Sequence, residues 1–151
     1  KNQADDEYFS SDDEDYSDGA IDEGTSGYKK GGYHPVELND VFKSRYTVEK
    51  KLGWGHFSTV WLAADKENEK VKVALKIVKS AAHYTEAAED EIQILQCVAK
   101  NDKNGNQPVV HMFDNFYHQG PNGKHVVMVF ETLGSSLLDL IKLYVYKGIP
   151  L

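Results

Sequence analysis

The feature of this sequence that most constrains its fold is the pair of glycines in the run "LGWGHFSTVW", residues 52–61. Residues 46–52 have strand-like alternation, and residues 59–65 are rich in Val, Trp and Leu. Both patterns predict β-strands, so Gly53 and Gly55 fall in the connection of a β-hairpin. Glycine weakens a strand interior and marks either a bulge or a close approach to the backbone. Phosphate oxygens are the usual guests of such backbone N–H groups, although a bulged hairpin is the commoner explanation of two glycines alone.

The rest of the sequence predicts three further strands and two helices. The strands are expected within residues 71–78, 109–117 and 126–131. One helix is expected from Thr85, as its N-cap, to near Lys100, because acidic residues follow Thr85 and apolar residues recur at helical spacing. A second helix is expected at residues 137–146. This order predicts an α+β fold, with a five-stranded antiparallel sheet and one main helix inserted after the third strand.

A lysine in an apolar strand adds a stronger indication of function. Lys76 ends the run "VALK", and a buried ammonium group is costly without a partner. Glu91 lies on the helix face that should pack on the sheet, together with Ala88 and Ile92. We therefore expect an ion pair between Lys76 and Glu91. That pair would hold the ammonium group near phosphates lying under the glycine hairpin.

These residues together resemble the N-terminal lobe of a eukaryotic protein kinase. The matching motifs are Gly53-x-Gly55-x-x-Ser58-x-Val60, then Val73-Ala74-Leu75-Lys76, then Glu91. Four runs resemble the SR protein kinases: "GGYHPV", "LGWGHFSTVW", "HYTEAAEDEI" and "HVVMVFETLG". The first two of these favour the SR protein kinases over a related dual-specificity group. The resemblance covers residues 31–151. It implies a serine/threonine kinase that uses ATP and Mg²⁺ to phosphorylate serines in Arg/Ser-rich splicing factors.

The resemblance also implies a role for each matching residue. Gly53, Gly55 and Ser58 belong to the loop that covers the phosphates, and Ser58 replaces the third glycine of the general pattern. Lys76 contacts the α- and β-phosphates, and Glu91 is its ion-pair partner. The adenine pocket comprises Leu52, Val60 and Ala74 around the base, Phe130 at the rear, and the hinge, where the Glu131 carbonyl and the Leu133 amide hold the adenine edge.

Two motifs that a kinase needs for phosphoryl transfer do not occur in these 151 residues. They are H-R-D-x-x-x-x-N and D-F-G, which supply the catalytic Asp and the Mg²⁺ ligands. In the nearest string, "HMFDNF", Asp114 is expected to be a surface carboxylate at a strand end. The resemblance places the missing motifs and Mg²⁺ ligands in a larger helical lobe, so we expect no metal site here and an inactive chain by itself. The alternative is a non-catalytic regulatory or binding module from a truncated kinase.

Acidic residues are concentrated at the start of the chain. Residues 1–23 contain ten carboxylates and one Lys, whereas the whole chain has a net charge of −7. The first segment has few large apolar residues to offset chain entropy, so we expect residues 1–32 to be a disordered acidic tail. The kinase lobe and hinge are expected at residues 33–133, and the start of the helical lobe at 134–151. An acidic tail that recruits basic Arg/Ser segments is a third functional hypothesis.

The remaining expectations concern compartment and partners. The chain has one cysteine and neither a signal peptide nor a long apolar run, which indicates a soluble intracellular protein without membrane contact. The resemblance implies localisation in both cytoplasm and nucleus. It also implies protein substrates rich in Arg and Ser, no direct binding of nucleic acid, and a monomer when complete.

Overall fold

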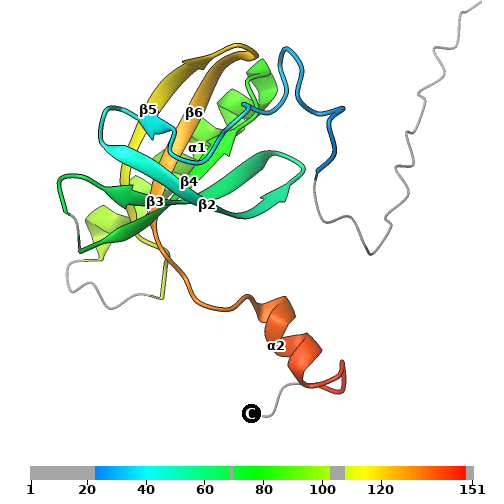
Figure 1. The fold of residues 1–151 in the computed structure, drawn as a ribbon. Coiled ribbons are helices and arrows are strands. Elements are labelled where there is room, and N and C mark those ends of the chain that lie inside the picture. The colour runs from blue at the N-terminus through cyan, green and yellow to red at the C-terminus, as the bar shows by residue number, and fades with distance from the viewer. Residues whose placement is uncertain (1–22, 69, 103–107, 149–151) are drawn as a thin grey trace, which may run out of the picture.

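A computed structural model describes residues 23–68, 70–102 and 108–148, which form a six-stranded sheet and two helices (Figure 1). The strand order is β1-β2-β3-β4-β6-β5, and all neighbouring strands are antiparallel. The strands are β1 (Val41–Phe42), β2 (Tyr46–Gly55), β3 (Ser58–Asp65), β4 (Lys72–Val78), β5 (Met112–Gly120) and β6 (Gly123–Glu131). Helix α1 (Ala82–Asn101) connects β4 to β5, and α2 (Leu137–Leu143) follows β6.

The predicted α+β fold is confirmed, with one strand more than the five expected. The additional strand, β1, pairs two residues with the start of β2. Its Phe42 side chain is only 1% exposed, because it packs into the core beside Tyr46. A two-residue strand carries too little sequence pattern to be recognised, and it forms because Phe42 is buried there.

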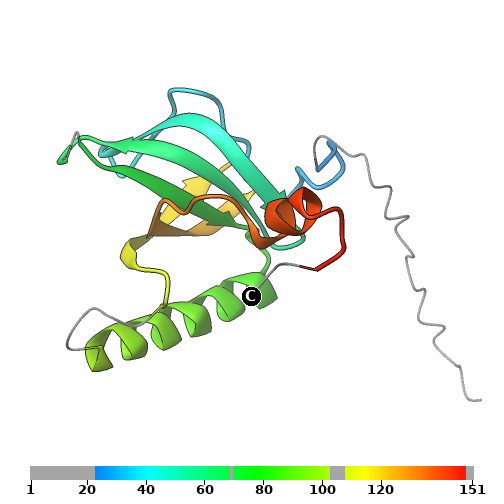
Figure 2. The same ribbon diagram turned by 90° about the horizontal axis from the view of Figure 1, so that it is seen from below.

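Each face of the sheet has its own apolar cluster, which explains why β6 is apolar along most of its length. Side chains in β4 and β6 alternate between the two clusters, so both faces of these central strands are covered. Figure 2 shows α1 lying along one of the two faces. The cluster under α1 contains Val78, Ala88, Val126, Met128 and Phe130. The cluster on the other face contains Phe42, Tyr46, Val48, Trp61, Ala63, Val73, Leu75, Ile77, Val127 and Val129.

Helix α1 begins earlier than its sequence indicates. The prediction that Thr85 is the N-cap is wrong, because Ala81 occupies that position and makes no side-chain cap. The chain just before the helix is held instead by tertiary contacts: the Ala81 N–H donates to the Gly31 carbonyl at 2.9 Å, and the Ser80 N–H donates to the Gly32 carbonyl at 3.2 Å. These partners are distant in sequence, so no local signal marks the start of the helix.

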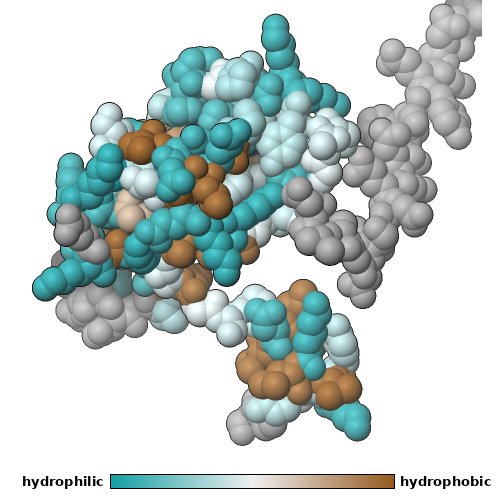
Figure 3. Space-filling view, in the orientation of Figure 1, coloured by the Kyte–Doolittle hydropathy of each residue, from teal (hydrophilic) through white to brown (hydrophobic). Residues whose placement is uncertain are grey.

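Helix α2 is shorter than the predicted 137–146. Its N-terminus has a full capping box, in which Ser136 and Asp139 bond each other's backbone and side chain. It ends where Val145 and Tyr146 adopt left-handed backbone angles, with φ of 53° and 57°. Across this fully described helix no residue is buried, and apolar side chains gather on its surface (Figure 3). Neither described helix is long and apolar enough to cross a membrane.

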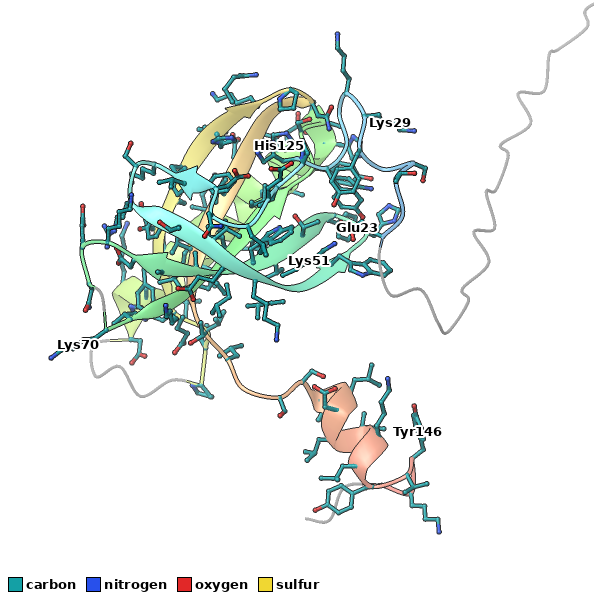
Figure 4. All side chains as sticks on the ribbon, in the orientation of Figure 1. Glu23, Lys29, Lys51, Lys70, His125 and Tyr146 are labelled. Carbon is teal, nitrogen blue, oxygen red and sulfur yellow. The ribbon has the colours of Figure 1, made fainter. Side chains whose placement is uncertain are left out.

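Residues 23–32 form turns that pack on the sheet, so the expectation of disorder is wrong for this part of the predicted tail. Glu23 forms an ion pair with Lys51 of β2, and the two side chains lie side by side in Figure 4. The Gly31 N–H donates to the Asn122 carbonyl in the β5–β6 turn at 3.0 Å. The expectation for residues 1–22 lies outside the described residues.

Candidate functional site

The glycine hairpin is present, and its glycines leave one stretch of backbone uncovered. The prediction that both glycines lie in the connection is wrong, because they form the end of β2, where Gly55 pairs with Ser58 and Gly53 with Val60 of β3. Neither glycine has a positive φ, and a Cβ atom built on either would meet no described atom within 4 Å. A register shift between Lys51 and Gly53 shows that β2 is also irregular here. Neither backbone conformation nor packing within the described chain requires glycine, which leaves room for a ligand close to the backbone.

The ion pair expected between strand and helix is also present. The Lys76 Nζ atom lies 2.7 Å from each carboxylate oxygen of Glu91. The two side chains are 27% and 40% exposed, so solvent screens the pair and its contribution to stability is small. Its effect is geometric. The Glu91 carboxylate bonds the Lys76 ammonium group from one side and so fixes the directions of the remaining N–H donors.

Sheet register brings the hairpin and this ion pair together. Gly53 pairs with Val60, Val60 with Lys76, and Lys76 with Met128, which makes one row across four strands. Cross-strand partners lie on the same face of a sheet. Lys76 reaches Glu91 on α1, so the row faces the side that α1 covers. A phosphate group under the hairpin would therefore meet the Lys76 ammonium on the same face.

Of the predicted adenine-pocket residues, Val60 lies in the row of Lys76, and Ala74 and Phe130 lie in the next row on the same face. Ala74 pairs with Phe130, and both contact the apolar cluster under α1. Phe130 is 9% exposed, whereas Leu52, which lies at the register shift of β2, is 49% exposed. Phe130 therefore packs in the core, whereas the apolar Leu52 side chain is left uncovered by the described residues.

The hinge residues run from Glu131, the last residue of β6, into the connection between β6 and α2. The Glu131 N–H donates to the His111 carbonyl at 3.0 Å, and the Glu131 Oε1 atom accepts the His111 N–H at 2.7 Å. These two bonds orient the backbone at the end of β6. Leu133 is 72% exposed in the extended segment that follows. Its side chain therefore contributes little to the described fold.

Asp114 is not the surface carboxylate that the sequence predicts. It lies inside β5 at a register shift, 2.7 Å from Lys43 Nζ and 3.0 Å from Tyr46 Oη. Burial alone would raise the pKa of Asp114, but the hydrogen bonds from Lys43 and Tyr46 outweigh it and the pKa is lowered. The role is structural, because the carboxylate joins the edge strand β5 to the opposite end of the sheet.

Sequence reasoning did not assign the contacts of two groups of residues. The first is the segment 27–36, whose Tyr33 hydroxyl contacts the hairpin itself. The second is a histidine cluster in which the His34 ring lies 4.6 Å from that of His118 and 5.0 Å from that of His125. Within the described ranges no three His, Cys, Asp or Glu side chains are placed to hold a metal ion. The run "GGYHPV" contributes to the family resemblance, but no periodicity or spaced motif indicates the contacts that either group makes.

Comparisons with known proteins agree with this geometry. The chain is 65% identical over 130 residues to the serine/threonine-protein kinase SRPK of Physarum polycephalum, covering 86% of this chain and 30% of that protein. It is 51% identical over 136 residues to human SRSF protein kinase 3, covering 89% of this chain and 24% of that protein. A solved crystal structure of a kinase domain superposes with a TM-score of 0.67 at 27% identity, covering 78% of this chain and 33% of that one. No protein-family model matches the chain. The chain therefore spans less than a third of the length of the curated relatives it matches.

Proposed function

Because this chain belongs to the SR protein kinase family, we propose that it is the ATP-binding lobe of a serine/threonine kinase that phosphorylates Arg/Ser-rich splicing factors. The observation that carries the proposal is the Lys76–Glu91 ion pair. Its lysine lies in the same sheet row as the uncovered backbone at Gly53. A structural ion pair alone would need no such neighbour. The high identity to proteins named as serine/threonine and SRSF kinases supports the substrate class.

In this proposal the residues of the chain bind and orient ATP. The Lys76 ammonium group would contact the α- and β-phosphates, while Glu91 fixes its direction. Backbone N–H groups of the hairpin would cover the phosphates, with Ser58 in place of a third glycine. Leu52, Val60 and Ala74 would enclose the adenine, Phe130 would close the rear, and the Glu131 carbonyl and Leu133 amide would bond its edge. Bound Mg²⁺ would neutralise phosphate charge, and its ligands would come from a D-F-G segment and a catalytic loop.

Phosphoryl transfer requires residues that these 151 do not contain, namely the H-R-D and D-F-G motifs. We therefore assign binding and orientation of ATP to this chain, and transfer to a protein that joins it to those motifs. The alternative of a non-catalytic binding module rests on one observation. The described lobe has an apolar cluster on each face of its sheet and so has a core of its own.

A nucleotide titration tests the binding proposal. We expect Mg-ATP added to the ¹⁵N-labelled chain to shift the backbone amide signals of residues 53–58, Lys76 and Leu133, and Lys76→Met to weaken that binding. Lys72→Met is the matched control, because Lys72 is a lysine of the same strand that pairs with Glu49 instead. Absence of shifts at these amides at millimolar ATP would contradict ATP binding by this chain.

A chimaera tests the kinase proposal itself. The chain would replace the matching segment of the Physarum relative, to which it is 65% identical. We expect the chimaera to phosphorylate an Arg/Ser repeat peptide and not a Lys/Ser peptide of equal charge. If the chimaera folds and binds ATP but prefers the Lys/Ser peptide, the proposed substrate class is wrong.

We also propose, from family membership alone, that the complete protein is a monomer that binds no nucleic acid and divides between cytoplasm and nucleus. Imaging of a fluorescent fusion in the cells that express it would test the localisation. A signal confined to one compartment would contradict it.

A further inference from the structure

The segment from Gly27 to Val36, which we call the N-terminal strap, contacts the glycine hairpin through Tyr33. The Tyr33 hydroxyl donates a hydrogen bond to the Gly55 carbonyl at 2.7 Å. Tyr33 is only 5% exposed, and the ammonium group of Lys79 lies 4.4 Å from the centre of its ring. The hydroxyl is therefore held against the hairpin by a buried ring and is not a swinging surface group.

Hydrogen bonds and close packing within the strap fix the backbone of Tyr33. The Tyr33 N–H donates to the Gly27 carbonyl at 2.9 Å, and Asn122 Nδ2 donates to the Tyr33 carbonyl at 2.6 Å. A Cβ atom on Gly27 would lie 2.6 Å from the Tyr33 ring, and one on Gly32 would lie 2.0 Å from the Gly27 carbonyl oxygen. Glycine is thus required at both positions for the strap to close on itself.

The tip of the hairpin is held from a second side as well. The Lys79 N–H, just after β4, donates to the Phe57 carbonyl at 3.0 Å. The Tyr84 hydroxyl of α1 lies 3.3 Å from His56 Nε2. Tyr33 and Lys79 therefore engage the carbonyls of Gly55 and Phe57, which flank His56.

Fixing the Gly55 carbonyl also fixes a donor on the opposite side of the same peptide group. A trans peptide is planar, and its C=O and N–H bonds point in opposite directions. The Gly55 carbonyl and the His56 N–H belong to one such plane. Because Tyr33 bonds the carbonyl, the His56 N–H points away from the Tyr33 hydroxyl. Without that bond, the plane beside a glycine turns easily, because glycine is the least restricted residue.

The strap also anchors the start of α1, the helix that carries the partner of Lys76. The carbonyls of Gly31 and Gly32 accept the N–H groups of Ala81 and Ser80, which lead into α1. That helix carries Glu91, which orients Lys76. One segment therefore fixes the glycine hairpin directly and the Lys76–Glu91 pair through the start of α1.

We propose that Tyr33 is a positioning residue for nucleotide binding, which sets the glycine hairpin by holding the Gly55 carbonyl. The proposal rests on the ATP-binding function proposed above, but its first part concerns the hairpin alone. No contact between Tyr33 and ATP is required. The hydroxyl acts through the Gly55–His56 peptide group.

The test compares two variants that each remove one buried tyrosine hydroxyl. Tyr33→Phe removes the bond to Gly55 and keeps the ring. Tyr46→Phe is the matched control, because its hydroxyl bonds Asp114 at 3.0 Å, its side chain is 1% exposed, and it lies far along β2 from the turn. We expect hydrogen–deuterium exchange of the amides at residues 53–58 to accelerate about fivefold in Tyr33→Phe and not in Tyr46→Phe. Exchange in β4 serves as the reference within each sample.

Nucleotide binding by the same three proteins separates the two proposals. We expect Tyr33→Phe to weaken Mg-ATP binding about fivefold and Tyr46→Phe to leave it unchanged. Hairpin exchange equal in Tyr33→Phe and the unmodified chain would overturn the inference. A looser hairpin with unchanged ATP affinity would overturn the role in nucleotide binding. If the unmodified chain fails to bind ATP while Tyr33→Phe loosens the hairpin, the proposed function fails and the anchoring of the hairpin by Tyr33 stands.

Discussion

The sheet with α1 and the short helix α2 are two regions held by different forces. Helix α1 has no side-chain cap, yet it is fixed by Ala88 in the core and by backbone bonds to the strap. Helix α2 has a complete capping box, but none of its described residues is buried. Capping satisfies orphan backbone groups at one end, whereas packing supplies most of a helix's stability. Local sequence signals are thus strongest where tertiary support is weakest.

The largest expected effect separates the two regions directly. Leu75 in β4 is fully buried, and Leu143 in α2 is 71% exposed. Leu75→Ala should lower the free energy of unfolding by about 2–5 kcal/mol, because it removes apolar contacts and leaves a cavity. Leu143→Ala should lower it by less than about 0.5 kcal/mol. Urea unfolding followed by tryptophan fluorescence measures both, and equal losses would break the comparison.

Next in size is a substitution that should change binding more than folding within the packed region. Lys76→Met should weaken ATP binding at least about tenfold, because it removes a charged donor to phosphate. Its effect on stability should stay below about 1 kcal/mol, since the pair with Glu91 is partly exposed. Glu91→Gln should act in the same direction but less strongly. Calorimetric ATP titration and urea unfolding of both variants test this, and an ATP affinity unchanged in Lys76→Met would refute the assigned role.

The histidine cluster makes the packed region sensitive to acid. Burial, reinforced by His118 and His125, lowers the pKa of His34 from 6.5 to about 4, with Asp40 acting in the opposite direction. The unfolded chain therefore binds more protons between about pH 6.5 and pH 4, so acidification favours unfolding. Stability should fall as pH drops through that window, by up to about 1.4 kcal/mol per pH unit for this one group.

Thermal unfolding at several pH values, with His34→Gln and exposed His83→Gln as a control pair, measures this effect. The slope with pH should become shallower only in His34→Gln. Among the described residues His34 Nδ1 and His125 Nε2 find no hydrogen-bond partner, which adds to the cost of charging this cluster. An identical slope in both variants would assign the acid sensitivity to other groups.

The smallest expected effect concerns α2 alone. Ser136→Ala removes the side chain that accepts the Asp139 N–H, and it should destabilise the helix by about 1 kcal/mol. Because α2 buries nothing, the loss should appear in the NMR chemical shifts of residues 137–143 and not in the unfolding midpoint of the sheet. A matching drop in that midpoint would show that the two regions are coupled after all.

The parts of the site that sequence could predict are those with a local or periodic signal. The glycine hairpin stands out because two glycines follow a strand-like run, and the Lys76–Glu91 pair because charges occur among apolar residues. Their contact at 2.7 Å confirms the expected pairing. The catalytic role of either residue remains a prediction that the experiments above would test.

The parts that sequence could not predict depend on partners far along the chain. Tyr33 meets Gly55, and Asp114 meets Lys43 and Tyr46, across separations that no periodicity records. Helix α1 begins where the Gly31 carbonyl accepts the Ala81 N–H, so its start is hidden from capping rules. Composition predicted disorder for residues 23–32, because glycine-rich turns look flexible until their contacts are known.

The strand order has a consequence for how the lobe folds. Strands β1 to β4 are each paired with the next in sequence, and so are β5 and β6, but β4 joins β6 across α1 and β5. Closing that long loop costs the most entropy, so we expect the β4–β6 pairing to form last, after a four-stranded meander and a separate hairpin. Stopped-flow folding of Val129→Ala and Val48→Ala would test this through a low φ-value at Val129 only. Lys76 and Met128, and likewise Ala74 and Phe130, pair between these two strands, so a nascent chain would acquire its nucleotide site only in the final step of folding.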